Sequence, residues 1–192
     1  GEDNSKVSVL SYALETGKTL TYSFPLDADG YIPRIKSTKF ADRIVIYTMN
    51  RHQDVLNLYK ANPMTGECSL LIKENANKYV KEEAMEGIRI MDDYILFPSD
   101  RDGFMHLYLY TIDGKLIRQI EKGKYDVIDV YGFDEKTGKT YFQAAAKTPM
   151  QREVYVADKN GKVTCLTPQE GWNSAVFSGD YKYFLNNWSN RN

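Results

Sequence analysis

The residues of this 192-residue chain that could act as nucleophile and base are few. A serine or cysteine hydrolase needs its nucleophile within reach of a base, most often a histidine. The chain has two histidines, His52 and His106, and no Gly-x-Ser-x-Gly motif, because the stretch GWNSA around Ser174 lacks that spacing. His106 occupies a position that Asn57 and Glu153 take in similar stretches, so we interpret it as a solvated strand residue. We therefore predict no catalytic residue in this chain.

Two pairs of aspartates could bind a cation. Asp27 and Asp29 stand in LDADGY, and Asp100 and Asp102 stand in SDRDGF. A calcium loop of the EF-hand type needs a further oxygen ligand before the glycine and a glutamate several residues later, and neither stretch has that set. Asp and Gly are also the residues that tight turns favour. We predict two turns here, and neither a metal site nor a cofactor.

The composition excludes several classes of partner. The formal net charge is −1, with acidic and basic residues interspersed, which does not indicate a nucleic acid or an anionic membrane as a partner. No apolar run approaches the roughly 20 residues of a membrane span. The 15 tyrosines and 8 phenylalanines favour β-strands over helices.

A repeat of about 48 residues provides the elements that position these side chains. Turn glycines precede a similar strand at Gly17, Gly66, Gly114 and Gly161, and their separations are 49, 48 and 47 residues. Each interval contains four short strand signals. Four strands in a unit of 40 to 50 residues are the signature of a β-propeller, whose blades stack face to face. Stacked blades also explain why the strand at 107–110, LYLY, is apolar on both faces.

The repeat begins and ends within a blade. We predict an all-β propeller fragment of about four blades of four antiparallel strands, forming a single segment over residues 1–192. Its units are half blades at 1–24 and 173–192 and full blades at 31–74, 84–122 and 126–168. We expect the two half blades to pair into one mixed sheet, within one chain or between two chains, so a homodimer is one option. Cys68 and Cys165 fall on fourth strands of non-adjacent blades, and we expect free thiols.

Three stretches resemble a known family. TMNRHQDVLNLYKANPMTGE, PSDRDGFMHLYLYTIDGK and EKGKYDVIDVYGFDEKTGKTYF are similar to the propeller of bacterial dipeptidyl peptidase IV, in the prolyl oligopeptidase family of serine peptidases. LTPQEGWNSAVFSGDYKYFLNNWSN resembles the family's last propeller repeat. The resemblance spans nearly the whole chain and matches the second half of an eight-bladed propeller.

The resemblance implies a role in peptide hydrolysis. Family members remove N-terminal dipeptides, preferably Xaa-Pro, with a Ser, Asp and His that lie in a C-terminal α/β-hydrolase domain. The propeller restricts access to the active site and helps to form the substrate pocket. The expected partners are therefore that hydrolase domain, in the same parent chain, and peptide substrates. The expected location is the periplasm or the cell surface and extracellular space.

The loop at residues 75–86 matches the family poorly, and its acidic pair is the candidate substrate-side feature. Adjacent carboxylates such as Glu82 and Glu83 can hold an ammonium group, although a solvated loop is the other interpretation. The family's own Glu pair lies upstream of the Asn50–Gln53 stretch, so its role is not transferred to these residues. The candidate substrate-side residues are Tyr79, Glu82 and Glu83.

Two other functions stay open at this point. The chain could be an independent propeller that binds protein or glycan ligands and is closed by pairing of its own termini. A weaker alternative is that the chain is itself a hydrolase. A Gly-x-Ser-x-Gly hydrolase segment in the same reading frame would favour the peptidase interpretation over both.

Overall fold

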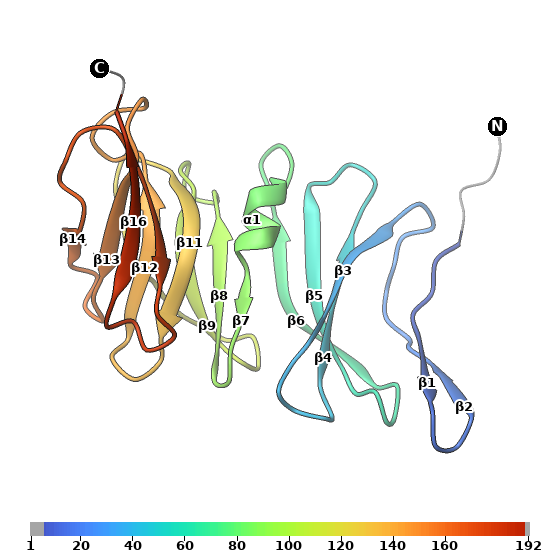
Figure 1. The fold of residues 1–192 in the computed structure, drawn as a ribbon. Helices are drawn as coiled ribbons and strands as arrows, with labels where there is room; N and C mark the ends of the chain where they lie inside the picture. Colours follow the sequence, from blue (N-terminus) through green and yellow to red (C-terminus); the bar gives the residue numbers. More distant parts are fainter. Residues whose placement is uncertain (1–5, 191–192) are drawn as a thin grey trace. The chain divides into compact units, whose positions relative to one another are not determined.

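The computed structural model describes residues 6–190, and nearly all of the regular structure in that range is β. Figure 1 shows its strands and its short helix in chain order. The chain divides into two compact units, each described by itself. Unit 1 consists of the residues up to Val80 together with Asp113–Lys115, and unit 2 of Lys81–Ile112 and the residues from Leu116 onward.

Unit 1 contains a four-stranded antiparallel sheet and a separate hairpin, and each strand pairs only with its neighbours in sequence. The sheet is formed by β3 (Tyr31–Ser37), β4 (Ile44–Met49), β5 (Val55–Ala61) and β6 (Cys68–Asn75), and the hairpin by β1 (Leu10–Ala13) and β2 (Lys18–Thr21). One sheet built from four consecutive strand signals is what the repeat predicts for this interval, and the prediction is confirmed.

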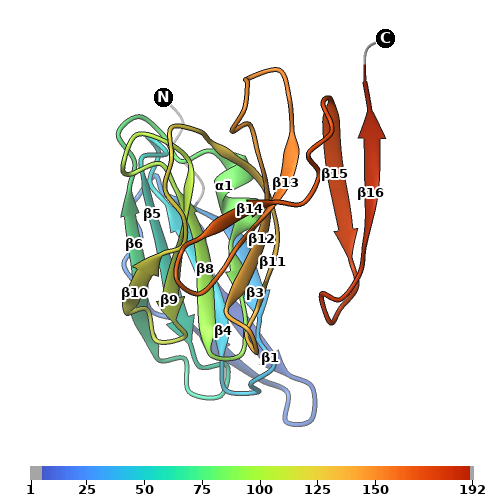
Figure 2. The ribbon, with the colours of Figure 1, turned by 90° about the vertical axis from the view of Figure 1, so that its left-hand side faces the viewer.

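Unit 2 contains two four-stranded antiparallel sheets, a two-stranded sheet and one short helix (Figures 1 and 2). The first sheet consists of β7 (Arg89–Ile90), β8 (Tyr94–Ser99), β9 (His106–Thr111) and β10 (Leu116–Gln119), and the second of β11 (Val127–Asp134), β12 (Lys139–Ala144), β13 (Glu153–Ala157) and β14 (Val163–Cys165). The two-stranded sheet consists of β15 (Trp172–Phe177) and β16 (Phe184–Ser189), and the helix is α1 (Glu82–Gly87).

The four repeat glycines adopt the turn conformation that their spacing predicts. Their φ angles are 66° at Gly17, 77° at Gly66, 86° at Gly114 and 84° at Gly161, a region that other residues rarely enter. Space adds a second constraint at Gly114, because a β-carbon there would overlap the backbone carbonyl group of Leu71. The turn therefore requires glycine for two independent reasons.

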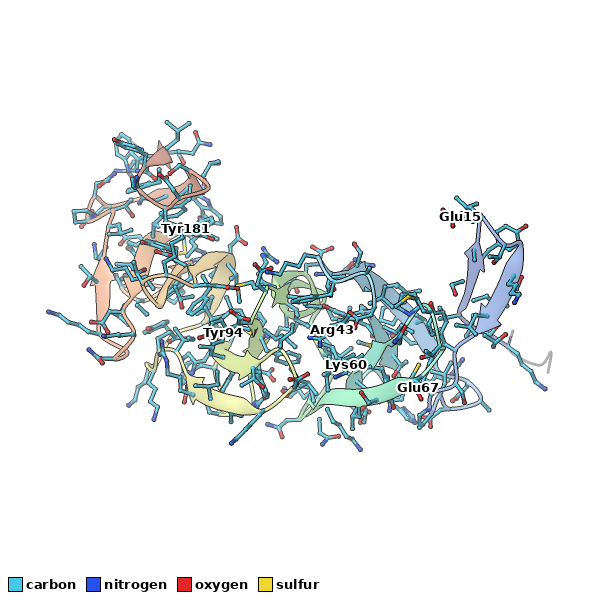
Figure 3. All side chains as sticks on the ribbon, turned by 90° about the horizontal axis from the view of Figure 1, so that it is seen from below. Glu15, Arg43, Lys60, Glu67, Tyr94 and Tyr181 are labelled. Carbon is cyan, nitrogen blue, oxygen red and sulfur yellow. The ribbon has the colours of Figure 1, made fainter. Side chains whose placement is uncertain are left out.

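A charged contact in unit 1 lies beside this turn. The Nζ of Lys60 donates a hydrogen bond to Asp113 at 3.2 Å, and a guanidinium nitrogen of Arg43 lies 3.8 Å from the same carboxylate oxygen. Figure 3 labels both basic side chains. The Asp113 side chain is 67% exposed, so this contact contributes at most about 1 kcal/mol.

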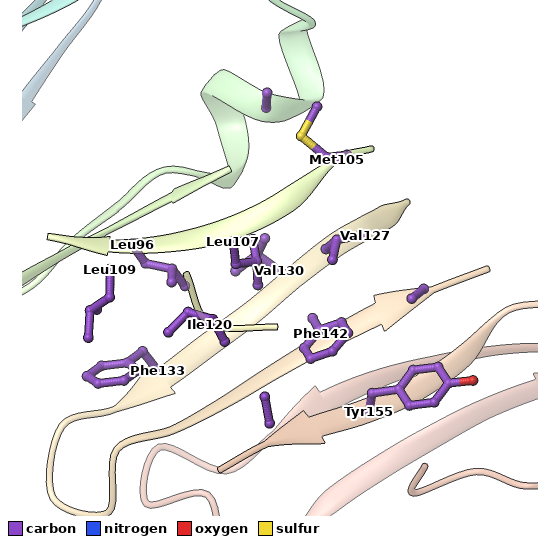
Figure 4. Packing of buried hydrophobic residues seen from close by; sticks show 13 residues of the cluster. Leu96, Met105, Leu107, Leu109, Ile120, Val127, Val130, Phe133, Phe142 and Tyr155 are labelled. Carbon is purple, nitrogen blue, oxygen red and sulfur yellow. The ribbon is translucent and has the colours of Figure 1, made fainter. Parts of the chain in front are cut away.

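The core of unit 2 lies between the faces of its two four-stranded sheets (Figure 4). Leu107 and Leu109 of β9 belong to this cluster together with Val130 and Phe142 of the second sheet. Tyr108 and Tyr110, on the opposite face of β9, are also buried, at 5% and 6% exposure. The prediction that this strand is covered on both faces is confirmed. Full burial of a leucine side chain stabilises the fold by about 1.5 to 3 kcal/mol.

Two expectations about the fold differ from the structure. The half blades do not pair with each other within the chain, because β1–β2 and β15–β16 are separate two-stranded sheets in the described structure. Their pairing between two chains stays a prediction. In each hairpin the two consecutive strands instead pair with each other across a short turn, which is the usual arrangement. The loop 75–86 is also not purely irregular, since α1 begins within it at Glu82.

The predicted solvated position in the third strand of each blade is a further correction. His106 is 2% exposed and Glu153 is fully buried, and Asn57 is only partly accessible. These polar side chains are buried because each has polar groups within its own blade. The hydroxyl of Tyr155, for example, donates to Glu153 at 3.1 Å.

Candidate functional site

The helix α1 forms one wall of the candidate site. Glu82 and Glu83 occupy its first turn, where the helix dipole favours negative charge. Ala84 and Met85 face inward and are buried. The end of the helix packs closely on β8, because a β-carbon at Gly87 would lie 2.8 Å from Cγ of Pro98.

A cavity of about 500 Å³ opens between this helix and β11, and we call it the α1 cavity. Its lining residues are Lys81, Glu83, Ala84, Glu86, Gly87, Arg89, Pro98, Met105, Asp126, Val127, Ile128, Asp129 and Val130. The lining combines aliphatic side chains with four carboxylates and two basic side chains. An apolar surface with a few charged groups, at this volume, is typical of a site for a small molecule or a peptide side chain.

Arg89 of β7 ties the helix to the opposite wall. Its guanidinium group donates hydrogen bonds to the carbonyl oxygens of Glu86, at the end of α1, and of Val130 in β11, the latter at 2.9 Å. Glu86, Arg89 and Val130 all line the α1 cavity, so the two hydrogen bonds connect its helix wall to its β11 wall. The helix, though only six residues long, is therefore held at both the Pro98 contact and the Arg89 contact.

Another part of the cavity lining consists of Met105 and the start of β11, which two hydrogen bonds join. The backbone N–H of Met105 donates to Oδ1 of Asp126 at 2.7 Å, and the N–H of Val127 donates to the Met105 carbonyl at 2.8 Å. Figure 4 shows Met105 close to the helix and Val127 on the neighbouring strand. Met105, Asp126 and Val127 therefore form one wall, which we call the Met105 wall.

A charged cluster lies behind the Met105 wall, and two of its members, His106 and Glu121, are buried. Nδ1 of His106 is 2.8 Å from Oδ2 of Asp102, and Nε2 is 3.6 Å from Oε2 of Glu121. Gln119 donates a second hydrogen bond to Asp102 at 2.8 Å. The N–H of Leu107 donates to Oε1 of Glu121 at 3.1 Å.

The surroundings shift the pKa values of this cluster. Burial raises the pKa of the Glu121 carboxyl, although the neighbouring His106 opposes the shift. At Asp102 burial acts in the same upward direction, but hydrogen bonds from His106 and Gln119 outweigh it, and its pKa lies below the ordinary value. Burial, with Asp102 as the next cause, raises the pKa of Tyr108 to about 12.

Of the three predicted substrate-side residues, one lines the α1 cavity. Glu83 lines the α1 cavity, whereas Glu82 is not among its lining residues. Tyr79 belongs to unit 1 and is 55% exposed. Sequence reasoning missed His106 and Glu121 as a buried pair, although each directly adjoins an apolar residue that is fully buried, Leu107 and Ile120 respectively.

The other candidate positions are turns and thiols. Gly30 donates its N–H to the Asp27 carbonyl, and Gly103 donates to the Asp100 carbonyl, as expected of tight turns. Cys68 and Cys165 are free thiols, and both are partly buried. Among residues 6–190, no cluster of three His, Cys, Asp or Glu side chains is arranged to hold a metal ion. Nor does that range contain a helix long and apolar enough to cross a membrane.

The curated proteins that this chain resembles include members of the dipeptidyl peptidases. Inactive dipeptidyl peptidase 10 of Mus musculus is 25% identical over 129 residues, covering 62% of this chain and 16% of that protein. Dipeptidyl peptidase 4 of Arthroderma otae is 31% identical over 98 residues, covering 48% of this chain and 12% of that protein. The chain thus spans less than a fifth of the length of these relatives.

Solved structures agree with the sequence comparison. The crystal structure of Porphyromonas gingivalis dipeptidyl peptidase 4 superposes with a TM-score of 0.92 at 36% identity, covering 98% of this chain and 27% of that one. A putative dipeptidyl aminopeptidase IV from Bacteroides ovatus, 22% identical with a TM-score of 0.75, shares the fold over 93% of this chain and 28% of its own.

The family description that matches this chain covers its full length. The family is the dipeptidyl peptidase IV (DPP IV) N-terminal region, matched over residues 1–192. The four-stranded antiparallel sheets of both units are the blades of that region's β-propeller. The chain therefore belongs to the dipeptidyl peptidase IV N-terminal region family.

Proposed function

We propose that this chain is the non-catalytic propeller portion of a dipeptidyl peptidase IV-like serine exopeptidase that removes N-terminal dipeptides, preferably Xaa-Pro. The observation that carries the proposal is the superposition on 98% of the chain at 36% identity with a dipeptidyl peptidase 4. The polar neighbours of His106 support a non-catalytic role, because within the described residues they are carboxylates and an amide rather than a hydroxyl or thiol nucleophile.

In this proposal the propeller restricts access to the active site, and the α1 cavity forms part of the substrate pocket. The chemistry of the cavity is suited to a peptide. Four carboxylates against two basic groups give its lining a net negative charge, which attracts the ammonium group of a free N-terminus. Its aliphatic residues offer a surface for a side chain. The catalytic Ser, Asp and His belong to an α/β-hydrolase domain of the parent chain, and the parent acts in the periplasm or at the cell surface.

The test compares the complete reading frame with the 192-residue chain. Both are assayed on fluorogenic Xaa-Pro amides and treated with a serine-directed covalent probe. We expect the complete protein to cleave the amides and react with the probe, and the chain alone to do neither. Stoichiometric labelling of the chain, or a complete protein that binds peptides without cleaving them, would overturn the assignment.

The contribution of the α1 cavity is tested with adjacent glutamates. In the complete protein, Glu83→Lys reverses a charge in the cavity lining, and Glu82→Lys reverses the neighbouring charge outside it. Loss of an interaction that binds the substrate and the transition state equally raises KM and leaves kcat unchanged. We expect that result for Glu83→Lys only. Equal effects of the two substitutions would contradict the cavity's part in substrate binding and leave the exopeptidase assignment standing.

A further inference from the structure

The charged cluster behind the Met105 wall has no part in the proposed function, and its geometry is unusual. The His106 side chain is 3% exposed and that of Glu121 is fully buried. Nε2 of His106 and Oε2 of Glu121 face each other, and neither has another partner with hydrogen-bonding geometry. Two buried polar atoms without other partners are costly unless a proton lies between the two groups.

The other ring nitrogen is already committed. Nδ1 of His106 lies 2.8 Å from Oδ2 of Asp102 and 3.2 Å from Nε2 of Gln119, which itself donates to Asp102. The pKa of the Asp102 carboxyl lies below its ordinary value because of these hydrogen bonds, so we assign the Nδ1 proton to a hydrogen bond with the Asp102 carboxylate. A neutral imidazole would then turn a bare lone pair on Nε2 toward the Glu121 carboxylate. With one added proton, the pair is either imidazolium and carboxylate or imidazole and carboxylic acid. In both cases the two facing atoms attract rather than repel.

Aromatic rings and one guanidinium group surround the pair. The Tyr125 ring packs edge-on to the His106 ring at 5.8 Å, and its hydroxyl interacts with Glu121 and favours the ionised carboxyl. Phe104 lies on the ring at 6.2 Å. Arg101, on the same loop as Asp102, stacks on Tyr108 at 4.3 Å and donates to the hydroxyl of Tyr110 at 2.8 Å.

We propose that His106 and Glu121 share one buried proton, and that its release to water loosens the Met105 wall of the α1 cavity. The pair lies at the centre of four hydrogen bonds that join residues 105–107 to residues 120–127. The four are Met105 N–H to Asp126, Val127 N–H to the Met105 carbonyl, Ile120 N–H to the Leu107 carbonyl and Leu107 N–H to Glu121.

Loss of the proton weakens the connection between residues 105–107 and residues 120–127. A buried Glu121 carboxylate then faces a lone pair, and it regains solvation only if the segment 120–127 moves away from β9. Such a movement breaks the bonds of Leu107 and Val127, and Val127 and Asp126 line the cavity. The cavity is thus rigid in acidic and neutral solution and loosens in alkaline solution. This conclusion concerns the wall itself and does not rest on the proposed peptidase function.

The test uses the 192-residue chain, in which the two histidines make imidazole nitrogen NMR unambiguous. His52 is exposed and serves as an internal reference. The ring nitrogens of both histidines, and the amide hydrogen exchange of Leu107 and Val127, are followed from pH 5 to pH 9. Values from Glu121→Gln, which keeps the side-chain shape, and from His52→Gln provide the comparison.

We expect the exchange of Leu107 and Val127 to exceed the base-catalysed increase once the ring-nitrogen signals of His106 show that the pair has lost its proton. Glu121→Gln should remove this excess and His52→Gln should not. If the two amides stay protected when the His106 ring signals change, or lose protection with no change in those signals, the proposal is wrong. Both of these outcomes are read from the wild-type chain and do not depend on a variant's folding.

Discussion

Tyr181 lies directly against Gly132 of β11, in the space that any larger residue at position 132 would fill. A β-carbon at Gly132 would overlap the Tyr181 hydroxyl group. The Tyr181 ring also stacks on that of Tyr141, the residue paired with Gly132 in β12, with centroids 4.9 Å apart and planes at 5°. The turn between β15 and β16 thereby attaches to the β11–β14 sheet through an aromatic ring that covers a glycine.

Gly132→Ala should destabilise the chain by about 1 to 3 kcal/mol, the usual cost of overpacking. Gly132 also has a φ of 153°, which adds strain for any other residue. Urea denaturation measures the change in the free energy of unfolding. Gly179→Ala is the matched control, because no atom lies within 4 Å of a β-carbon at that position. Equal midpoints for the two variants would contradict the Tyr181 contact.

Glu121→Gln should change how stability depends on pH. Burial raises the pKa of Glu121 in the folded chain, so the protonated carboxyl is favoured by folding. That contribution is fully present below the pKa of the unfolded chain and is lost as pH rises through the folded-state pKa. We therefore expect Glu121→Gln to gain stability relative to wild type as pH increases from 4 to 8. Thermal unfolding across this range is the measurement. Glu170→Gln, at an exposed position, should follow the wild type, and a parallel curve for Glu121→Gln would exclude the predicted shift.

His106→Ala should destabilise by about 3 to 5 kcal/mol, because it leaves the buried Glu121 carboxyl without its partner. His52→Ala removes the exposed histidine and should change the free energy of unfolding by no more than about 0.5 kcal/mol. Guanidinium denaturation at pH 7 compares the two. A small effect at both positions would support the solvated interpretation of His106 that the sequence favours.

Leu107→Ala should cost about 2 to 5 kcal/mol, since the residue is fully buried in the core of unit 2. Leu116→Ala makes the same chemical change at a position that is 47% exposed and should cost much less. Chemical denaturation, analysed with the same dependence on denaturant concentration for both variants, gives the difference in their free energies of unfolding. Similar costs at the two sites would mean that β9 is less enclosed than described.

The strands could be predicted because their signals are local. At Tyr108 and Leu109 the side chains alternate between two apolar faces, and a glycine with positive φ follows at Gly114. Both features depend only on neighbouring residues. The helix α1 was not predictable in this way, because the six residues Glu82–Gly87 are too few to show a helical period.

The buried pair could not be predicted because its members meet across a sheet. His106 and Glu121 are 15 residues apart in the sequence, and the register of β9 and β10 brings them together. The equivalent position is His106 in one repeat and Glu153 in the next, a variation that suggests exposure. Each of these side chains is nevertheless buried, with polar partners of its own. Glu153 has the Tyr155 hydroxyl and, at 3.9 Å, Lys147. Polar identity alone therefore does not report exposure in this fold.

The pairing of β3–β6 has a consequence for the order in which the chain is made. All the ladder hydrogen bonds of this sheet join residues between Tyr31 and Asn75. Each strand pairs only with strands that are adjacent to it in the sequence. Contacts between near neighbours form quickly, since little chain entropy is lost in closing short loops. This blade can therefore complete its hydrogen bonding during translation once Asn75 has left the ribosome, because no strand beyond Asn75 takes part in its sheet.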